Sequence, residues 1–383
     1  MKSVQPRLLR RVFLVFLVIP CGLLFAQAAV KLTLDAGALV YAGLEEADWS
    51  SFASGELDFQ SSASAGVRGR LTMTAMLLSV NGAALARFDI TRLFIRANLP
   101  LFDGFVPRLS LGKNNIAWGK GAFFNAGNLF FGKAGAQGLV GGVTALARNE
   151  TEWLALLYIP LGALSFAEAA ASLPLPAFSV IATPQGELML PTPVEAGSGA
   201  SYGARLSGNF DAFAAELAWH YSGIDDKQEL SCSVSGALGD AELYGSYALA
   251  LPYDRARITG GLLAVNFAPM LDSTSFRLEA LVQPEASWEQ KELTNEERLD
   301  GYPYGVHILA AVSVGLGTAV LTARSLYSPV DNSALFSLTV LWKPYQGLWY
   351  YIGGSINAGS EGALYESWQT GSWSATGGLR FVF

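Results

Sequence analysis

Apolar and polar residues alternate with a period of two along much of this chain. In the segment 213–221, Phe213 and Leu217 share one parity, whereas Glu216 and His220 share the other. Successive side chains of a β-strand point to opposite faces, so this pattern predicts a strand with one apolar and one polar face. An amphipathic helix would instead repeat its apolar positions every three to four residues. The clearest alternation of this kind is found in the segments 213–221, 241–250, 274–283 and 334–343.

Extending this interpretation along the chain predicts roughly 18 strands, most of them near the 9–11 residues that a tilted membrane-crossing strand needs. When the connections are numbered in order, every one longer than eight residues is odd-numbered. Strands that run up and down around a barrel would place these long connections at one end. The expected strands are 30–41, 57–66, 69–79, 86–98, 107–118, 141–148, 152–159, 200–208, 211–221, 228–236, 241–250, 256–267, 274–283, 305–314, 318–327, 334–343, 349–358 and 371–383.

The segment 306–323 is the one stretch that resembles a membrane-spanning helix. Gly315 and Gly317 lie at its centre, where glycine would weaken a helix. Two apolar strands joined by a turn at these glycines fit the sequence better, so we predict a hairpin.

The C-terminal segment ends on an aromatic residue. Trp373, Leu379, Phe381 and Phe383 share one parity, and Arg380 lies on the opposite face. A strand with this pattern and a terminal aromatic resembles the closing strand of bacterial outer-membrane β-barrels. The resemblance implies that Phe381 and Phe383 form a signal for the barrel-assembly machinery, which would be a partner of this chain.

The N-terminal segment has the order of a secretory signal peptide. Basic residues precede an apolar run over 12–25, and Ala26-Gln27-Ala28 follows it. The run is shorter than the roughly 20 residues of a membrane-spanning helix, so we expect cleavage after Ala28. This divides the chain into a signal peptide, 1–28, and a barrel domain, 29–383. An uncleaved anchor remains an alternative, as does a lipoprotein that uses Cys21, although Pro20 disfavours lipoprotein processing.

Charge and cysteine content narrow the function classes. Cleavage would remove four of the 25 basic residues and none of the 32 acidic ones, changing the net charge from −7 to −11. A nucleic-acid partner is therefore not expected, because such proteins carry a basic surface. Apolar residues make up 51% and charged residues 15%, and the apolar positions are spread thinly, as in strands that face lipid on one side. Cys232 would be the single cysteine left, so no internal disulfide is expected.

A block in the first half of the chain resembles a recurring pattern of outer-membrane porin-like barrels. Arg92 to Arg96 ends a predicted strand, and Leu109 to Phe130 reads LSLGKNNIAWGKGAFFNAGNLF. In that family a strand ending in Gly-Arg-Gln precedes a Trp-Gly block and an Asn-Pro-x-Asp loop. Here Lys113-Asn114 stands at the Arg-Gln position and 126–128 at the Pro-x-Asp position. The resemblance implies a porin-like channel in the outer membrane of a diderm bacterium.

Residues on the polar strand faces are candidates for the channel lining. Inward charge tunes selectivity in a channel, although each such charge could instead form an ion pair across the wall. The candidates are Arg92, Arg96, Arg108, Lys113, Glu216, Glu242, Arg277, Glu279 and Arg380.

Two long connections are candidates for narrowing the bore. Loop 119–140 is predicted either to fold inward, with Lys113, Lys120 and Lys133 near the lumen, or to leave solvated lysines outside. Loop 160–199 is rich in proline and poor in charge, and we expect it either to fold over the mouth as a lid or to pack externally. The acidic connection 284–304 lacks calcium-loop spacing and is expected to be a solvated external loop without a metal.

The sequence offers no catalytic constellation. His220 and His307 are the only histidines, and neither stands in a serine-hydrolase arrangement, while metal and nucleotide motifs are absent. We therefore expect no enzyme activity and no cofactor. Two function classes remain open: a diffusion channel for small polar solutes, and a surface-exposed structural or adhesive barrel that binds ligands through its external loops.

The fold predicted from these observations is all-β: a transmembrane antiparallel up-and-down β-barrel of about 18 strands, within a range of 14–18. Unpaired backbone groups cannot be left in hydrocarbon, so the last strand must pair with the first. A barrel of about 16–18 strands leaves an aqueous channel, whereas about eight strands would be filled by side chains. Outer-membrane lipid would surround it, and the sequence leaves homo-oligomerisation open.

Overall fold

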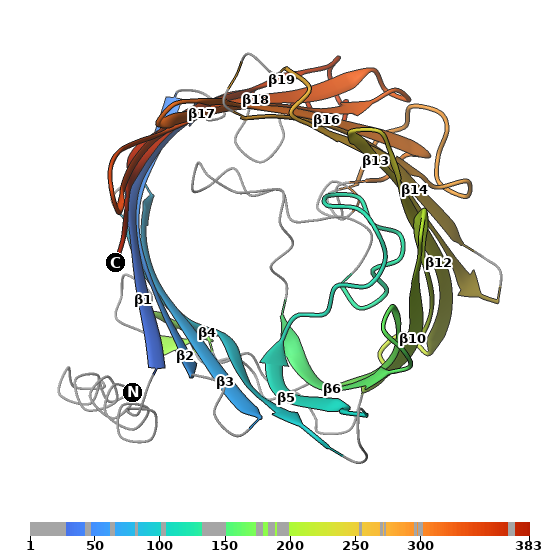
Figure 1. Ribbon diagram of the computed structural model, residues 1–383. Helices are drawn as coiled ribbons and strands as arrows, with labels where there is room; N and C mark the ends of the chain where they lie inside the picture. Colours follow the sequence, from blue (N-terminus) through green and yellow to red (C-terminus); the bar gives the residue numbers. More distant parts are fainter. Residues whose placement is uncertain are drawn as a thin grey trace.

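In the computed structural model, the chain is a single closed barrel of antiparallel strands around a wide bore (Figure 1). The structure describes residues 28–42, 47–61, 66–80, 83–100, 105–131, 151–173, 179–182, 188–189, 199–252, 255–268, 271, 273–294, 297, 302–366 and 372–383. The expected signal peptide and the expected strand 141–148 lie outside the described residues. In the part of the chain that is described, no helix is long and apolar enough to cross a membrane.

The sheet contains 20 strands among the described residues, and all but the short β8 and β9 form the 18-stranded wall. The strands are β1 (Ala28–Ala42), β2 (Ala47–Ser61), β3 (Val67–Val80), β4 (Ala83–Asn98), β5 (Arg108–Asn114), β6 (Glu152–Pro160), β7 (Ser165–Leu173), β8 (Ser179–Ala182), β9 (Leu188–Met189), β10 (Ser201–Phe210), β11 (Phe213–Ser222), β12 (Lys227–Leu238), β13 (Ala241–Leu251), β14 (Ala256–Val265), β15 (Ser273–Val282), β16 (Val306–Leu316), β17 (Ala319–Ser328), β18 (Ser333–Tyr345), β19 (Leu348–Ala358) and β20 (Trp373–Val382). The fold class predicted from the sequence is confirmed.

The wall closes where β20 pairs with β1. Nine residue pairs join the two strands, from Thr33 with Val382 to Tyr41 with Ser374. On the inner face, the Arg380 guanidinium donates to the Asp35 carboxylate at 2.6 Å and 3.1 Å. The backbone of Phe383 continues the pairing with Leu32. The seam is therefore stabilised by the backbone hydrogen bonds between β1 and β20 and by an ion pair that faces the bore.

Apolar side chains form the outer surface of the wall. Along β11, Phe213, Leu217 and Trp219 are exposed, whereas Glu216 and His220 are buried on the inside. Exposed aromatic residues gather near both strand ends, as in the girdles of outer-membrane barrels. Those at the end that carries both termini are Phe210, Phe213, Trp342, Tyr350 and Phe381, and those at the opposite end are Trp49, Tyr202, Trp219 and Trp373.

Several connections differ from the expected ones. The expected loop 42–56 is largely strand, because β2 begins at Ala47 and pairs with β1 along its whole length. Within the expected loop 160–199, β7 forms part of the wall between β6 and β10. This strand is rich in alanine, which has low β-propensity and gives a weak alternation signal. The hairpin predicted at Gly315 and Gly317 is confirmed as β16–β17, with Gly317 at positive φ.

The strand β5 ends early and releases the chain into the bore. Gly112 has φ +128°, and a Cβ there would lie 2.1 Å from the Leu93 carbonyl oxygen, so only glycine fits. Beyond Asn114 the wall is continued by β8, which pairs with residues 86–89 of β4. The expected strand 107–118 is therefore too long at its C-terminal end. The β8–β9 hairpin covers a stretch of the β4 edge above the point where β5 turns inward.

The lipid-facing wall predicts a depth-dependent response to charge. Leu278 lies in the middle of β15 and Leu316 at the turn end of β16, and both are exposed. We expect Leu278→Arg to reduce the free energy of unfolding by about 2–4 kcal/mol and Leu316→Arg by about 0–1 kcal/mol. Urea unfolding of the barrel folded into lipid vesicles would measure both values. Equal losses at the two positions would argue against a membrane around this wall.

Candidate channel constriction

The segment 115–131 lies inside the barrel along the inner wall (Figure 1). Its backbone N–H groups donate hydrogen bonds to polar side chains on several wall strands. Gly119 donates to Glu216 on β11, Lys120 to Ser246 on β13, and Ala126 to Thr259 on β14. We call residues 115–131 the inner loop. The inward alternative for the loop that follows Trp118 is confirmed for its described residues, and Lys133 lies outside them.

Glu279 on β15 is the strongest anchor of the inner loop. Its carboxylate accepts hydrogen bonds from the N–H groups of Ala122, Phe123 and Phe124 at 2.7–2.9 Å. The side chain is 1% exposed, and the Arg277 guanidinium lies 3.5 Å away. Hydrogen bonds to a charged group contribute about 1.5–3 kcal/mol each, so this carboxylate fixes the turn at 122–124.

A second anchor holds the start of the inner loop. Arg205 on β10 donates to Glu168 on β7 and to Glu216 on β11, both at 2.9 Å. Glu168 also accepts the indole N–H of Trp118 at 2.7 Å. The Trp118 side chain is fully buried and packs edge to face against Phe130 at 4.9 Å. Both carboxylates are thus occupied by the loop and by one arginine.

Glycine is required where the inner loop turns. Gly119 and Gly121 have φ of +75° and +132°, which side chains rarely adopt. A Cβ at Gly121 would lie 2.0 Å from the Phe124 carbonyl oxygen. The Asn125 amide donates to the Trp118 carbonyl at 2.9 Å and closes the turn. The Trp-Gly-x-Gly pattern therefore encodes the return of the chain along the wall.

Packed apolar residues fill the side of the bore next to β15–β18. The inner loop contributes Phe123 and Phe124, which meet residues from the connections 283–305 and 359–372. The buried cluster consists of Phe123, Phe124, Leu281, Leu293, Tyr302, Tyr304, Leu309, Leu326, Leu335, Leu364 and Tyr365. Asp331 helps to fix the last connection, since it accepts the Leu364 N–H at 2.7 Å. The acidic connection expected to be wholly solvated therefore also packs part of its length inside the barrel.

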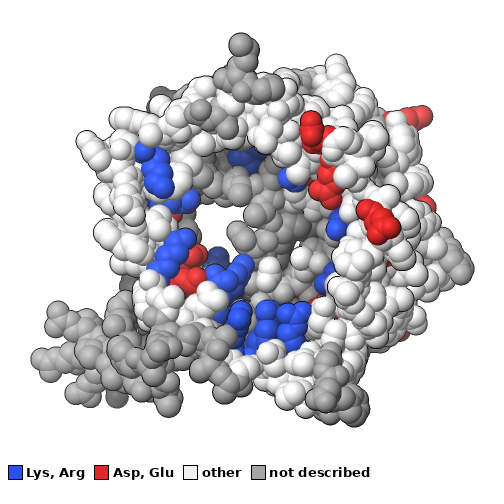
Figure 2. Space-filling view, viewed as in Figure 1, with Lys and Arg blue, Asp and Glu red and all other residues white. Residues whose placement is uncertain are grey.

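The opposite side of the bore is basic. Figure 2 shows an opening with Lys and Arg side chains gathered on the side of β1–β5, and acidic side chains across from them. Among described residues, no ion pair involves Arg68, Arg92, Arg96 or Arg108. On β2–β5 the inward basic residues are Arg68, Arg70, Arg87, Arg92, Arg96, Arg108 and Lys113, and the inward acidic residues are Asp48, Glu56, Asp58 and Asp89. This face carries excess positive charge although the whole chain is acidic.

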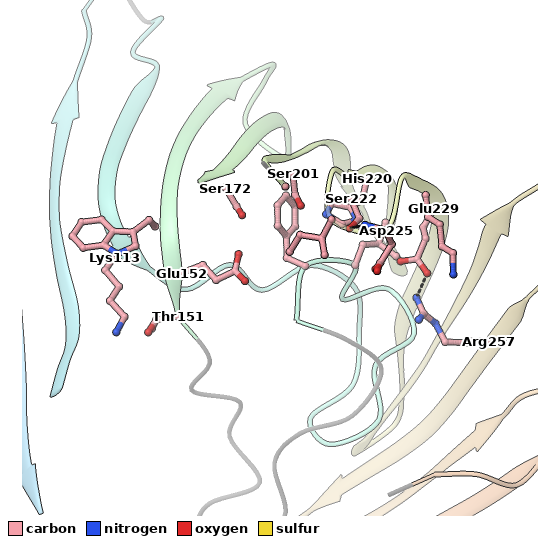
Figure 3. Close-up of a pocket in the computed structure, with 16 residues that line it drawn as sticks. Lys113, Thr151, Glu152, Ser172, Ser201, His220, Ser222, Asp225, Glu229 and Arg257 are labelled. Carbon is pink, nitrogen blue, oxygen red and sulfur yellow. Dashed lines mark hydrogen bonds and ion pairs between the residues drawn. The ribbon is translucent and has the colours of Figure 1, made fainter. Parts of the chain in front are cut away.

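A side pocket of about 440 Å³ lies between the inner loop and the wall strands β6, β7 and β10–β12 (Figure 3). Lys113 and Glu152 stand on one side, and Glu229 and Arg257 form an ion pair at 2.8 Å on the other. His220 is 5% exposed and packs against Phe130, with ring centroids 4.5 Å apart. Acidic and basic residues are balanced in this pocket, since Glu152, Asp225 and Glu229 face Lys113, Lys227 and Arg257, whereas basic residues are in excess on the β2–β5 face.

The structure places the sequence-predicted candidates in five different settings inside the barrel. Arg92, Arg96 and Arg108 lie on the basic face, and Glu242 lies inward near the end that carries the termini. Glu216, Glu279 and Arg277 lie under the inner loop, and Arg380 lies at the seam. Lys113 is buried, donates to the Ile90 carbonyl at 2.6 Å and lies 3.4 Å from Asp89. A lining role for each of them stays a prediction, as does the assembly role of Phe381 and Phe383.

Sequence reasoning missed Glu168 and Arg205. Glu168 fell within an expected loop, so it was not assigned to a strand face. Arg205 shares its parity with Ser201 and Gly203 and is opposite to Tyr202 and Leu206, so the alternation could have identified it as inward. Arg205 binds two carboxylates from neighbouring strands because of the register between those strands. The alternation along one strand does not predict that register.

No family model and no curated protein matches this chain. Among solved structures it is similar to OccD3 (OpdP) of Pseudomonas aeruginosa, with a TM-score of 0.51 and 8% identity over 94% of this chain and 92% of that chain. OprB of Pseudomonas putida gives a TM-score of 0.43 and 10% identity over 95% of both chains. A triple mutant of Rhodopseudomonas blastica porin gives 0.43 and 12% over 93% of this chain and 100% of that chain. At these identities the likeness shows the fold alone, a porin-like barrel.

The anchoring of the inner loop is testable by proteolysis. Glu279→Leu removes the acceptor for three backbone N–H groups, so we expect chymotrypsin to cleave at Phe123 and Phe124 at least tenfold faster in the folded barrel. Glu242→Leu is the matched control, because Glu242 lies inward on β13 without a contact to the inner loop among described residues. Equal cleavage of both variants and the parent would show that Glu279 does not hold the loop.

Proposed function

We propose that this chain is an outer-membrane channel through which small polar solutes diffuse, with anions favoured over cations. The observation that carries the proposal is the division of charge inside the bore. The carboxylates Glu168, Glu216 and Glu279 are bound by the inner loop and by arginines. By contrast, four guanidinium groups on β3–β5 have no ion pair among the described residues: Arg68, Arg92, Arg96 and Arg108. Fixed charge that lines a narrow passage selects permeant ions of the opposite sign.

The barrel fold supports the same assignment. An 18-stranded wall encloses more space than side chains fill. Among the described residues, the inner loop and the packed connections lie against β6, β7, β10, β11 and β13–β18, which leaves the β1–β4 side of the bore open. The lipid-facing belt and its aromatic ends fit the outer membrane of a diderm bacterium, with outer-membrane lipid around the barrel. Assembly through the C-terminal strand would accompany this location, as the terminal Phe383 implies.

The alternative, a structural or adhesive barrel that binds ligands through external loops, would not require a conducting bore. Planar-bilayer recording separates the two functions. Discrete conductance steps at nanomolar protein support the channel, whereas no steps at any protein concentration would favour the adhesive barrel.

Ion selectivity tests the charge argument. With a tenfold KCl gradient across the bilayer, we expect the reversal potential to have the sign of a channel that is more permeable to chloride than to potassium. Changing Arg68, Arg92, Arg96 and Arg108 together to Gln should move it toward zero or toward cation preference, because the basic excess on the passage is lost.

A charge-neutral double variant provides the control. Arg70→Gln combined with Asp58→Asn removes an ion pair of 2.7 Å on the same face and leaves the net charge of the passage unchanged. Its reversal potential should equal that of the parent. A quadruple variant that keeps the selectivity of the parent would refute the assignment of anion preference to this face.

A further inference from the structure

Three arginines converge at one mouth of the barrel. Arg68 is the second residue of β3, Arg96 lies near the end of β4, and Arg108 is the first residue of β5. Together with Gly66 and Asn98 they line a cavity of about 330 Å³. The cavity lies at the end where β1 begins and β20 ends, which is the periplasmic mouth if the barrel has the orientation of outer-membrane barrels. This cavity is separate from the inner loop and from the side pocket.

The register brings these like charges close together. Arg68 is paired directly with Arg96, and Asn98 with Arg108. Like charges at opposing positions of a sheet are destabilising. The charges of Arg108 and Arg68 repel the Arg96 guanidinium, and the charge of Glu168 attracts it. Glu168 is already bound by Arg205 and Trp118, so its charge is largely compensated.

Neighbouring groups hold the cavity in shape. The Arg108 guanidinium stacks on the ring of Tyr158 at 3.9 Å from its centroid. The Asn98 N–H donates to the Gly66 carbonyl at 2.8 Å, and Gly66 adopts a positive φ of 76°. Stacking fixes the plane of a guanidinium and leaves its N–H edge free to bind an acceptor. The cavity is therefore organised by contacts that do not consume its donors.

We propose that this cavity binds a multiply charged oxyanion, namely a phosphoryl group, either as phosphate or as part of a small organic phosphate. Guanidinium groups match the geometry of phosphate oxygens and bind them through two parallel N–H···O bonds. Three such groups offer more charge and more donors than a chloride ion uses. This proposal extends the anion preference proposed above. It rests on the proposed channel function only in that the ligand would pass through the barrel.

Binding to the detergent-solubilised barrel tests the site without requiring conduction. Isothermal titration with inorganic phosphate at constant ionic strength should show saturable binding. Arg96→Gln and Arg108→Gln should each weaken it at least tenfold, because each removes one guanidinium. Titration with glycerol phosphate and with succinate distinguishes the ligands: binding of succinate as tight as that of the phosphates would overturn the phosphoryl assignment.

Arg87→Gln is the matched control, since Arg87 lies on the same strand at the opposite end, paired with Asp89. It removes the same charge and should leave phosphate affinity within twofold of the parent. A similar loss in all three variants would mean a diffuse potential rather than a site. Circular dichroism of each variant checks that the barrel is folded. Arg96→Lys provides a second variant, which keeps the positive charge but lacks the two parallel N–H donors of a guanidinium group.

The outcomes of the two proposals are separable. An anion-selective conductance without saturable phosphate binding would refute the site and leave the channel. Phosphate binding that depends on Arg96 and Arg108, in a barrel without conductance steps, would support the site and refute the channel.

Discussion

Every backbone N–H and C=O group in the wall must find its hydrogen-bond partner within the sheet. In hydrocarbon an unsatisfied backbone group costs several kcal/mol, so a sheet with an open edge would not be stable there. The pairing of β20 with β1 removes both edges, and the Asp35–Arg380 ion pair lies over this seam. Closure by 18 strands in turn makes the barrel too wide for side chains to fill. The inner loop and the packed connections occupy part of the space that results.

The same requirement governs the inside of the barrel. A chain segment that enters the bore brings backbone N–H groups with it, and these need acceptors. The wall provides them as carboxylates and hydroxyls on successive strands, with Glu279 alone accepting three. Anchoring the inner loop therefore uses acidic side chains that would otherwise face the passage. A chain that is acidic as a whole thus acquires a basic face inside the barrel, because Glu168, Glu216 and Glu279 bind the inner loop and several inward arginines have no ion pair among the described residues.

The sequence predicted the general fold because alternation and strand length are local properties. The strands β11, β13 and β15 were found within a few residues, and the inward placement of Glu216 and Glu279 followed from their parity. Where the alternation is weak, as in the alanine-rich β7, the prediction failed. The positive φ of Gly112, next to the inward-bound Lys113, depends on the close approach of Leu93 in a neighbouring strand. Such features arise from contacts between strands and leave no clear local signal.

Adjacent residues of one strand can show whether the wall faces lipid on its outside and a water-filled bore on its inside. Single cysteines would replace Arg92 or Leu93 in a Cys232→Ser background, and the folded barrel in lipid vesicles would be treated with a membrane-impermeant thiol reagent. Arg92 faces the bore and Leu93 is exposed on the outer wall, so the cysteine at 92 should react rapidly and that at 93 at least tenfold more slowly. Equal reaction at both positions, or faster reaction at 93, would contradict a sealed wall with an aqueous interior.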